Sequence, residues 1–590
     1  MTLANIAEDR AAHQANGVNG EWTYIKKHGF ERTPLKIAIA GAGAAGICLA
    51  IKILQAQKSG RLGPVDTLVF ERAEGDIPSH VYQFAFAPYA DWPEYYSSSK
   101  DINRYMHIVA QKFGVESWIK VNHTVVSAIY EQDRAKWVLQ VQEKGQAVKT
   151  VEVDIYIPAT GVLSQVNRPN IPGMENFESS KILHTAEWPP NLDFKTAFKD
   201  ENVAVIGIGS SGLQTVGAIT PYTKNVSVFA RSKFWISPPL VAEPAGQRKW
   251  KGGNFFYSEE EKAQFRKNSK ALYKHGSELS AATMHVFDVF FKGSEKQESI
   301  KKEVRQTMEQ ELRDPDLIAK LVPDFDVWCR RVTPCVPFME AIHQPHVELV
   351  TDHIQKITKD GIITKNDRFI KVDRIIYATG FDTTFKPKYP FKGRDGKDLG
   401  EVWAKRPKAN LHKPHPAYMS LAVADFPNMF FMCGPGTVFA NGSLLAGIEV
   451  NANYIVDAVA KLQSQDILSM EISQDAQDEY NAQQDTLMKD LVFTSSCSSW
   501  YKGGQPDAPP DALFAGSTLQ FMEMLSVPRW EDWKFKYRHG NRFSFLGQGT
   551  SSVEAQDGDR AYYLSEEVHK DPLRITDLRP PMNGAVPLNL

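Results

Sequence analysis

Two glycine-rich loops and a histidine motif between them are the parts of this chain whose residue types and spacing could do chemistry. The loops are Gly41-Ala-Gly-Ala-Ala-Gly46 and Gly207-Ile-Gly-Ser-Ser-Gly212, and the motif is His184-Thr-Ala-Glu-Trp188-Pro189. Glycine at these positions lets the backbone approach a pyrophosphate closely, and a following helix offers free N–H groups to the phosphates. Two dinucleotide sites are therefore predicted. The residues expected to hold them are Gly41, Gly43 and Gly46 at the first site and Gly207, Gly209, Ser210, Ser211 and Gly212 at the second.

The elements around each loop have the order that a dinucleotide fingerprint requires. Apolar runs, 35–40 and 202–206, precede the loops and predict strands, and a helical stretch follows each loop. One such loop alone is weak evidence. Two in one chain favour two dinucleotides bound side by side, the arrangement needed to pass a hydride from one to the other.

The residues at the ends of the next predicted strands indicate which dinucleotides bind. The strand 65–70 ends in Glu71, where a dinucleotide fold places an acid to hydrogen-bond ribose hydroxyls, so the first site favours FAD. The matching strand 225–230 ends in Arg231-Ser232. An arginine there accommodates a 2′-phosphate, so the second site favours NADPH over NADH.

Composition and charge exclude several classes of protein. At 590 residues with 42% hydrophobic side chains, the chain is long and apolar enough for two to four globular domains. Its formal net charge of -2 and lack of a long basic run give no electrostatic footprint for nucleic acid. No apolar stretch approaches a membrane span and the N-terminal residues lack the apolar core of a signal peptide, so we expect a cytoplasmic protein without integral membrane segments.

The cysteines give no sign of a metal site. There are five, Cys48, Cys329, Cys335, Cys433 and Cys497. They show neither zinc-binding spacing nor a disulfide framework. We therefore expect most of them to be buried thiols, and no bound metal.

The order of these signals predicts an α/β fold with two Rossmann-like dinucleotide-binding domains, the FAD domain being discontinuous. Two strands that end in Ala-Thr-Gly, 157–161 and 375–380, follow the two nucleotide units and plausibly let the chain cross between domains. A charged stretch with apolar residues at helical spacing, 259–320, predicts a helical insertion, and the region after Tyr501 predicts a loop-rich tail. In chain order, we expect an N-terminal extension (1–34), the first segment of the FAD domain (35–165), the first segment of the NADP domain (166–240), the helical insertion (241–325), the second segment of the NADP domain (326–378), the second segment of the FAD domain (379–500) and the C-terminal tail (501–590).

Taken together, these motifs resemble those of the class B flavoprotein monooxygenases, and among them the Baeyer–Villiger monooxygenases of the fungal, FAD-binding monooxygenase type. The resemblance covers nearly all of the chain. Besides the loops and both Ala-Thr-Gly turns it rests on His184-x-x-x-Trp188-Pro189, Arg231-Ser232, Cys329-Arg330-Arg331, the segment 426–435 and Cys497-Ser-Ser-Trp-Tyr501. One portion of the fingerprint departs from the family pattern. Glu178 and Ser180 stand where the family has Phe and Gly, and Phe177 lies one residue early, as after a one-residue slip.

The resemblance implies a role for each motif residue. Arg331 would be catalytic and stabilise negative charge that develops on oxygen. Arg330 would point the other way, toward the 2′-phosphate, together with Arg231 and Ser232. His184 and Trp188 would fasten the NADP domain as it rotates during the cycle, rather than transfer protons. Further contacts to the flavin are implied for Tyr82, Val125 and Gly434.

The largest departure from the family lies directly after Glu71. Relatives carry a Gly-Gly-Thr-Trp segment, a Tyr-Pro-Gly turn and an Asp before Ile-Pro-Ser-His, whereas here Glu71 runs through four residues to Asp76 and straight into Ile77-Pro-Ser-His80. In the family this segment covers part of the flavin. Asp76 matches the Asp on either side of the gap. If the gap precedes it, Asp76 supports the catalytic Arg331 and also contacts the cofactor.

The function that the resemblance implies is NADPH- and O₂-dependent insertion of one oxygen atom next to a ketone, giving an ester or lactone, in secondary-metabolite biosynthesis. N- or S-oxygenation of a soft nucleophile is the alternative, which Trp188-Pro189 disfavours because N-oxygenating relatives have Tyr or Phe at that place. A flavin-poor, non-catalytic homologue is a third reading, supported only by the missing segment. The expected partners are FAD, NADPH, O₂ and a small organic substrate.

Overall fold

The computed structural model describes residues 25–71, 79–237, 254–404 and 417–564. The chain divides into two compact units. One comprises Met1–Thr33, Gln463–Ile467 and Tyr537–Leu590, and the other Pro34–Leu462 and Leu468–Lys536. Both nucleotide loops belong to the second unit, as do all the site residues described below.

The first parallel sheet carries the first glycine loop. Its strand order is β3-β2-β1-β7, with all neighbours parallel. The strands are β1 (Leu35–Ala40), β2 (Val65–Glu71), β3 (Ile119–Val121) and β7 (Ile155–Pro158). Helix α2 (Ala44–Lys58) follows β1 directly, and α3 (Ser99–Phe113) precedes β3. Residues of β1 and β7 are buried on both faces, which explains their continuous apolar sequence.

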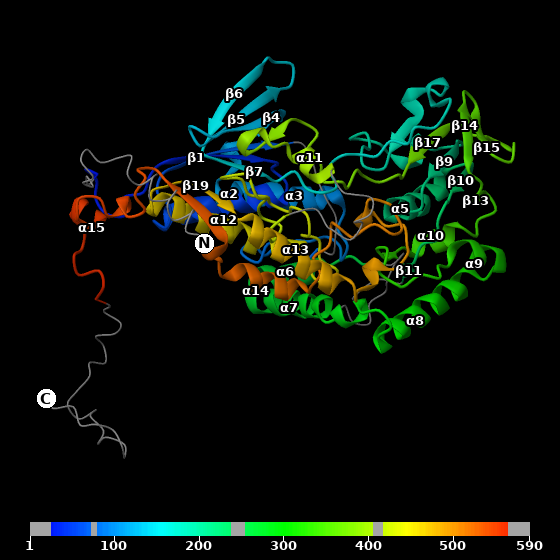
Figure 1. Cartoon of the computed structure of the whole chain (residues 1–590). Coiled ribbons are helices and arrows are strands. Elements are labelled where there is room, and N and C mark those ends of the chain that lie inside the picture. Colours follow the sequence, from blue (N-terminus) through cyan, green and yellow to red (C-terminus); the bar gives the residue numbers. More distant parts are fainter. Residues whose placement is uncertain (1–24, 72–78, 238–253, 405–416, 565–590) are drawn as a thin grey trace, which may run out of the picture. The chain divides into compact units, whose positions relative to one another are not determined.

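A second parallel sheet carries the second loop. Its strand order is β13-β10-β9-β17-β8, again with parallel neighbours. The strands are β8 (Ile182–His184), β9 (Asn202–Ile206), β10 (Asn225–Phe229), β13 (Val347–Val350) and β17 (Arg374–Tyr377). Helix α5 (Ser210–Ile219) follows β9 and packs against α10 (Val336–Ala341), as Figure 1 shows.

Smaller sheets flank these two. Three strands of one sheet form an antiparallel meander, with β18 added parallel to its first strand, and a three-stranded antiparallel sheet follows β13. The first comprises β4 (His123–Glu131), β5 (Lys136–Glu143), β6 (Val148–Val153) and β18 (Phe391–Lys392), and the second β14 (Ile354–Thr358), β15 (Gly361–Thr364) and β16 (Phe369–Lys371). Two two-stranded pairs are β11 (Ile236–Ser237) with β12 (Thr333–Pro334) and β19 (Ile467–Ile472) with β20 (Trp533–Tyr537).

The charged stretch between the two halves of the second sheet is helical, as predicted. It forms α6 (Glu259–Lys267), α7 (Ser269–Met284), α8 (Glu295–Leu312) and α9 (Pro315–Leu321), drawn in green in Figure 1. The remaining helices are α4 (Phe194–Ala197), α11 (Leu399–Ala404), α12 (Leu444–Ser464), α13 (Gln474–Met488), α14 (Thr518–Ser526) and α15 (Ser552–Ala555). The predicted α/β fold with two Rossmann-like units, a helical insertion and a loop-rich tail is confirmed. The domain boundaries stay a prediction.

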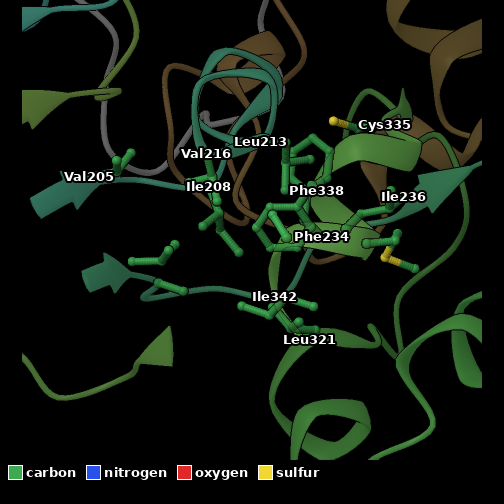
Figure 2. Packing of buried hydrophobic residues seen from close by; sticks show 14 of the residues in the cluster. Val205, Ile208, Leu213, Val216, Phe234, Ile236, Leu321, Cys335, Phe338 and Ile342 are labelled. Carbon is green, nitrogen blue, oxygen red and sulfur yellow. The ribbon is translucent and has the colours of Figure 1, made fainter. Parts of the chain in front are cut away.

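The core of the second nucleotide domain fixes the loop that leaves β9. Leu213 and Val216 on α5 pack with Phe338 and Ile342 around α10 and with Phe234 after β10. Figure 2 shows these side chains converging from strand and helix into one interior. Because all of them are buried, the start of α5 is held in position by packing rather than by its own propensity.

Candidate functional site: two glycine loops around one cavity

In the first loop, each of the three positions requires glycine for a different geometric reason. Gly41 has a φ of +119°, and a Cβ there would lie 2.2 Å from the Ala159 carbonyl oxygen. A Cβ at Gly46 would lie 1.9 Å from the Gly41 oxygen, so the helix could not pack this close to the strand. At Gly43, the N-cap of α2, a Cβ would meet nothing within 4 Å. Open space in front of a helix N-terminus fits a pyrophosphate.

The second loop repeats this geometry residue by residue. Gly207 has a φ of +110°, with a Cβ position 2.5 Å from the Ala378 oxygen, and a Cβ at Gly212 would lie 2.1 Å from the Gly207 oxygen. Gly209, the N-cap of α5, again faces open space, with nothing within 4 Å of its Cβ position. The residues present therefore fit a dinucleotide at both loops.

The side chains expected at a 2′-phosphate lie together at the end of β10. Arg330 Nη1 donates a 2.7 Å hydrogen bond to Ser232 Oγ, and its guanidinium lies 4.4 Å from the centre of the Phe234 ring. Burial lowers the pKa of Arg330 to about 10, which leaves it charged at neutral pH. The adjacent Arg231 is exposed. Two arginines from segments a hundred residues apart thus present positive charge at one strand end, where an anion could bind.

One cavity of about 3140 Å³ connects the two loops. Ligand pockets are usually about 300–1,000 Å³, so this volume is large enough for two dinucleotides and a further molecule. The predicted site residues that line it are Gly41, Gly43, Tyr82, Val125, Trp188, Gly207, Gly209, Ser210, Ser211, Arg231, Ser232, Arg330, Arg331 and Gly434. Gly46, Gly212 and His184 do not line it, because the glycines face backbone and the histidine is buried.

Arg331 lines this cavity, whereas the nearby Tyr501 does not. Arg331 is exposed and lines the cavity, and its positive charge lies close enough to oppose the rise that burial causes in the pKa of Tyr501. Tyr501 is only 4% exposed and does not line the cavity. The adjacent Trp500 does. Sequence reasoning did not assign a role to Trp500 or Tyr501, although both stand in the motif that starts at Cys497.

His184 is built into the second sheet rather than into the cavity wall. It is 1% exposed, its Nδ1 accepts a 3.1 Å hydrogen bond from the Ala186 N–H, and its Nε2 lies 3.5 Å from Thr379 Oγ1. Burial, and then the charge of Arg168, lower its pKa, so the ring is neutral at neutral pH. Because Nδ1 accepts, the ring proton is on Nε2 and faces the second Ala-Thr-Gly turn. Trp188 lines the cavity and packs on Phe194 with ring centroids 5.1 Å apart.

The described residues include only some of the residues that are predicted to contact the flavin. Glu71 is the last residue of β2, but Asp76 lies outside the described residues. Tyr82 and Val125 line the cavity, and Gly434 does so where a Cβ would lie 2.6 Å from the Ser420 oxygen. The structure thus brings three of these residues to the cavity.

The expectation that the cysteines form no disulfide is wrong, because one pair of them is bonded. Cys329 and Cys497 form a disulfide, with Cα atoms 6.3 Å apart and a sequence separation of 168. Cys48, Cys335 and Cys433 are free. Spacing along the chain does not show the bond because folding, not local sequence, brings the two segments together. Within the described residues, no group of three or more potential ligands could hold a metal ion.

Two parallel sheets with glycine loops facing one cavity define an oxidoreductase with two dinucleotide sites. The pyridine nucleotide-disulphide oxidoreductase family matches residues 35–287. The FAD-binding monooxygenase stcW of Emericella nidulans is 30% identical over 89% of this chain and 87% of its own length. A Baeyer-Villiger monooxygenase of Pseudomonas aeruginosa is 27% identical over 79% of this chain and 85% of its own. The chain therefore belongs to the FAD-binding monooxygenase family.

The solved structures agree with this fold. Cyclohexanone monooxygenase from Rhodococcus sp. Phi1, solved bound to NADP⁺, superposes with a TM-score of 0.69 at 22% identity, covering 86% of this chain and all of that one. The predicted family and the FAD-dependent monooxygenase class are confirmed. No helix in the described part of the chain is both long and apolar enough to cross a membrane.

Proposed function

We propose that this enzyme uses NADPH and O₂ to insert one oxygen atom next to a ketone carbonyl, giving an ester or lactone. The observation that carries the proposal is the place of Arg331, a permanent cation on the wall of the cavity that both glycine loops line. A cation so placed can stabilise negative charge on an oxygen atom as that charge develops, which is often the largest single contribution to such reactions.

The chain's own residues would bind and orient the two cofactors. The N-termini of α2 and α5, with open space in front of Gly43 and Gly209, would hold the two pyrophosphates. Arg231 and Arg330 would hold the 2′-phosphate of NADPH by charge-assisted hydrogen bonds. When bound, NADPH supplies a hydride and FAD passes the electrons to O₂.

Side chains in and beside the cavity would perform the remaining roles. Arg331 would donate hydrogen bonds to the carbonyl oxygen as it becomes an oxyanion. Apolar residues on the wall, among them Val286, Phe439 and Leu445, would exclude water from the reacting atoms. His184 would hold the turn at Thr379 in place through its Nε2 proton, with no role in proton transfer. Trp188 would fix the linker against the second nucleotide domain.

Two lines of support favour a ketone over an amine or sulfide. One relative is named a Baeyer-Villiger monooxygenase, and the superposed structure is named a cyclohexanone monooxygenase bound to NADP⁺. The other is Trp188 followed by Pro189, where N-oxygenating relatives have Tyr or Phe. The proposal includes a cytoplasmic location and a role in secondary metabolism, which fractionation and product analysis of the native cells would test.

The test is NADPH consumption by the purified yellow protein against matched ketones, amines and sulfides, with products identified by mass spectrometry. We expect esters or lactones from at least one ketone, each containing one ¹⁸O atom when the reaction runs under ¹⁸O₂. Oxygenated amines or sulfides with all ketones recovered unchanged would overturn the ketone assignment in favour of heteroatom oxygenation. A colourless protein without flavin absorption would contradict the proposal that the protein is a flavin-dependent enzyme.

A further inference from the structure

Lys502 is a buried lysine next to a stretch of chain that is open to solvent. Its side chain belongs to a residue that is 3% exposed, whereas residues 503–507 are all exposed. Lysine is almost never fully buried unless its ammonium group has partners. Because Lys502 does not line the cavity, those partners must come from the protein around it.

Two carbonyl oxygens accept hydrogen bonds from this ammonium group. Nζ of Lys502 donates to the Ser495 oxygen at 2.7 Å and to the Pro506 oxygen at 2.6 Å. It also lies 4.0 Å from Sγ of Cys329. The two carbonyls stand at the two ends of the segment 495–506, so one side chain joins both ends of this loop. Such charge-assisted bonds are stronger than those between neutral groups.

The backbone of the loop 495–506 is folded tightly on itself. The N–H groups of Lys502 and Gly504 donate to the Ser499 oxygen at 3.0 and 2.8 Å, and Ser498 Oγ donates to the Gly504 oxygen at 2.7 Å. Gly503 and Gly504 have φ values of +59° and +80°, which glycine adopts at no steric cost. The turn they make brings the chain back toward its start, where Lys502 joins the ends.

One side of this loop forms wall of the cavity. Thr383, another residue of the wall, donates from its Oγ1 to the Trp500 oxygen at 3.0 Å. Lys502 lies among the lining residues in sequence and supports them without lining the cavity itself. The residues of the loop that line the cavity are Ser498, Ser499, Trp500, Gly503 and Gly504.

The loop is attached to the segment 326–331, which ends in the two arginines of the cavity wall. The disulfide between Cys329 and Cys497 is a covalent link between them. Ser495 Oγ donates to Asp326 Oδ2 at 2.6 Å, a second link between the same two segments. The place where the loop meets the arginine segment is therefore fixed, and Lys502 decides how the rest of the loop folds from there.

We propose that Lys502 is a positioning residue that keeps the loop 495–506 folded into the cavity wall, and that this wall excludes water during oxygen transfer. The inference rests on the proposed function. While the loop is folded, its lining residues cover the cavity beside the arginine segment. When it opens, water reaches the reacting atoms, and NADPH, a proton and O₂ give NADP⁺ and hydrogen peroxide instead of product.

The buried ammonium group gives the loop a characteristic pH dependence. Burial lowers the pKa of Lys502 to about 8, with the charge of Asp507 acting to raise it and that of Lys292 to lower it. In an open loop the pKa returns to about 10.4. Because the folded value is the lower one, opening takes up a proton, and the loop opens less often as the pH rises. These two pKa values give about a tenfold decrease in opening from pH 7 to pH 9.

The first test is hydrogen exchange of the amides of 502–505, read by peptide mass spectrometry without substrate and corrected for the intrinsic rate at each pH. Their exchange should rise about tenfold in Lys502→Met, which has no N–H donors. Wild type should show about a tenfold fall from pH 7 to pH 9, and Lys502→Met none. Lys461→Met is the matched control, because Lys461 also has a pKa lowered by burial, lies 5.3 Å from the ring centres of Trp530 and Phe535, and does not line the cavity. It should behave as wild type.

The second test is the ratio of product to NADPH consumed. In Lys502→Met, flavin reduction should stay within about twofold of wild type while hydrogen peroxide per NADPH rises severalfold. Lys502→Arg keeps the charge and the donors and should recover much of the wild-type ratio. Lys461→Met should keep it fully.

Each outcome decides part of the inference. Wild-type exchange and peroxide in Lys502→Met would overturn the positioning role, and faster exchange with unchanged peroxide would overturn the role of the loop in excluding water. If Lys502→Met does not fold, the pH dependence of exchange in the wild type decides, and its absence would contradict the role of Lys502. If the wild type oxygenates no ketone, the proposed function fails, but the exchange rates still decide whether Lys502 holds the loop.

Discussion

The Nη1 atom of Arg330 donates a hydrogen bond of 2.7 Å to the Oγ atom of Ser232. The bond orients a guanidinium that also stacks on Phe234, 4.4 Å from the ring centre. Its neighbour Arg331 is exposed and lines the cavity. Consecutive arginines therefore serve different regions of one site, and each can be tested separately.

Replacing Arg231 and Arg330 together by Ala should change the cofactor preference. We expect the KM for NADPH to rise at least about tenfold, since charge-assisted hydrogen bonds to the 2′-phosphate are lost, while the KM for NADH changes less than about twofold. Arg368→Ala, which removes a positive charge paired with Glu348 away from the cavity wall, is the control. An unchanged ratio of the two KM values in the double variant would place the 2′-phosphate elsewhere.

The second and third glycines of the second loop should respond differently to a single added methyl group. A Cβ at Gly212 would lie 2.1 Å from the Gly207 oxygen, so Gly212→Ala should lower the free energy of unfolding by at least about 1–3 kcal/mol. Gly209→Ala meets open space and should keep the wild-type melting temperature, yet weaken NADPH binding, because its methyl group enters the pyrophosphate site. Thermal unfolding without cofactor and NADPH titration separate the effects. Tight NADPH binding by Gly209→Ala would remove the pyrophosphate from this loop.

The glycine loops could be predicted from sequence because their demands are local. Gly207 needs a positive φ, and Gly212 needs close approach to the backbone of Gly207, only five residues earlier. The position of Arg330 beside Ser232 follows from sequence only through the family resemblance, since the two lie 98 residues apart.

Sequence reasoning failed where distant segments meet. The disulfide between Cys329 and Cys497 spans 168 residues, and no periodicity or spacing encodes such a pairing. Tyr501 stands in a recognisable motif, but the apolar cluster that buries it, with Phe290 and Leu513, is assembled from segments far apart in the sequence. Long-range packing decides both.

Arg331→Ala should separate reduction from oxygenation. We expect NADPH to reduce the flavin at close to the wild-type rate, because hydride transfer needs no oxyanion stabiliser, while product formation falls about 100- to 1,000-fold. Stopped-flow absorbance gives the first rate and product analysis the second. Arg134→Ala, in the exposed turn after β4, is the control because its partners Glu131 and Glu152 lie away from the cavity. Product within tenfold of wild type would remove Arg331 from the catalytic role.

Asp382 follows the second Ala-Thr-Gly turn. Its carboxylate should make the free energy of unfolding decrease at acid pH. Its carboxylate accepts 3.0 and 2.7 Å hydrogen bonds from the N–H and Oγ1 of Thr384 and pairs with Lys388. Burial raises the pKa of Asp382, but these partners outweigh it and lower the value to about 2. The folded pKa lies below the unfolded one of about 3.9, so the contribution is complete above that pH and is lost as the pH falls toward 2.

The measurement is the melting temperature of Asp382→Asn against wild type from pH 7 down to pH 3. We expect the variant to melt lower at pH 7 and the difference to shrink below about pH 4, as the wild-type carboxylate gains a proton. Asp133→Asn, in the exposed turn between β4 and β5, should follow wild type throughout. A difference that is the same at pH 3 and pH 7 would show that the carboxylate charge contributes nothing.

The short sequence between Glu71 and Asp76 should weaken flavin retention. The family resemblance implies a Gly-Gly-Thr-Trp to Tyr-Pro-Gly segment there that covers some of the flavin, and this chain has no such segment between Glu71 and Asp76. If Gly43 and the N-terminus of α2 still hold the pyrophosphate, FAD should bind but dissociate during dialysis, and much of the NADPH consumed should appear as hydrogen peroxide because water reaches the reacting atoms.

Inserting a family-like segment ahead of Asp76 should restore both properties. The expected results are flavin that stays bound through dialysis and a several-fold lower fraction of hydrogen peroxide per NADPH. An insertion of equal length made of Gly and Ser is the control, because it lengthens the chain without supplying the Trp and Tyr side chains that would cover the ring. Rescue by that control would mean that length alone matters. Stoichiometric FAD after dialysis of the unmodified protein, with little peroxide during turnover of a ketone, would show that other residues of this chain close the gap.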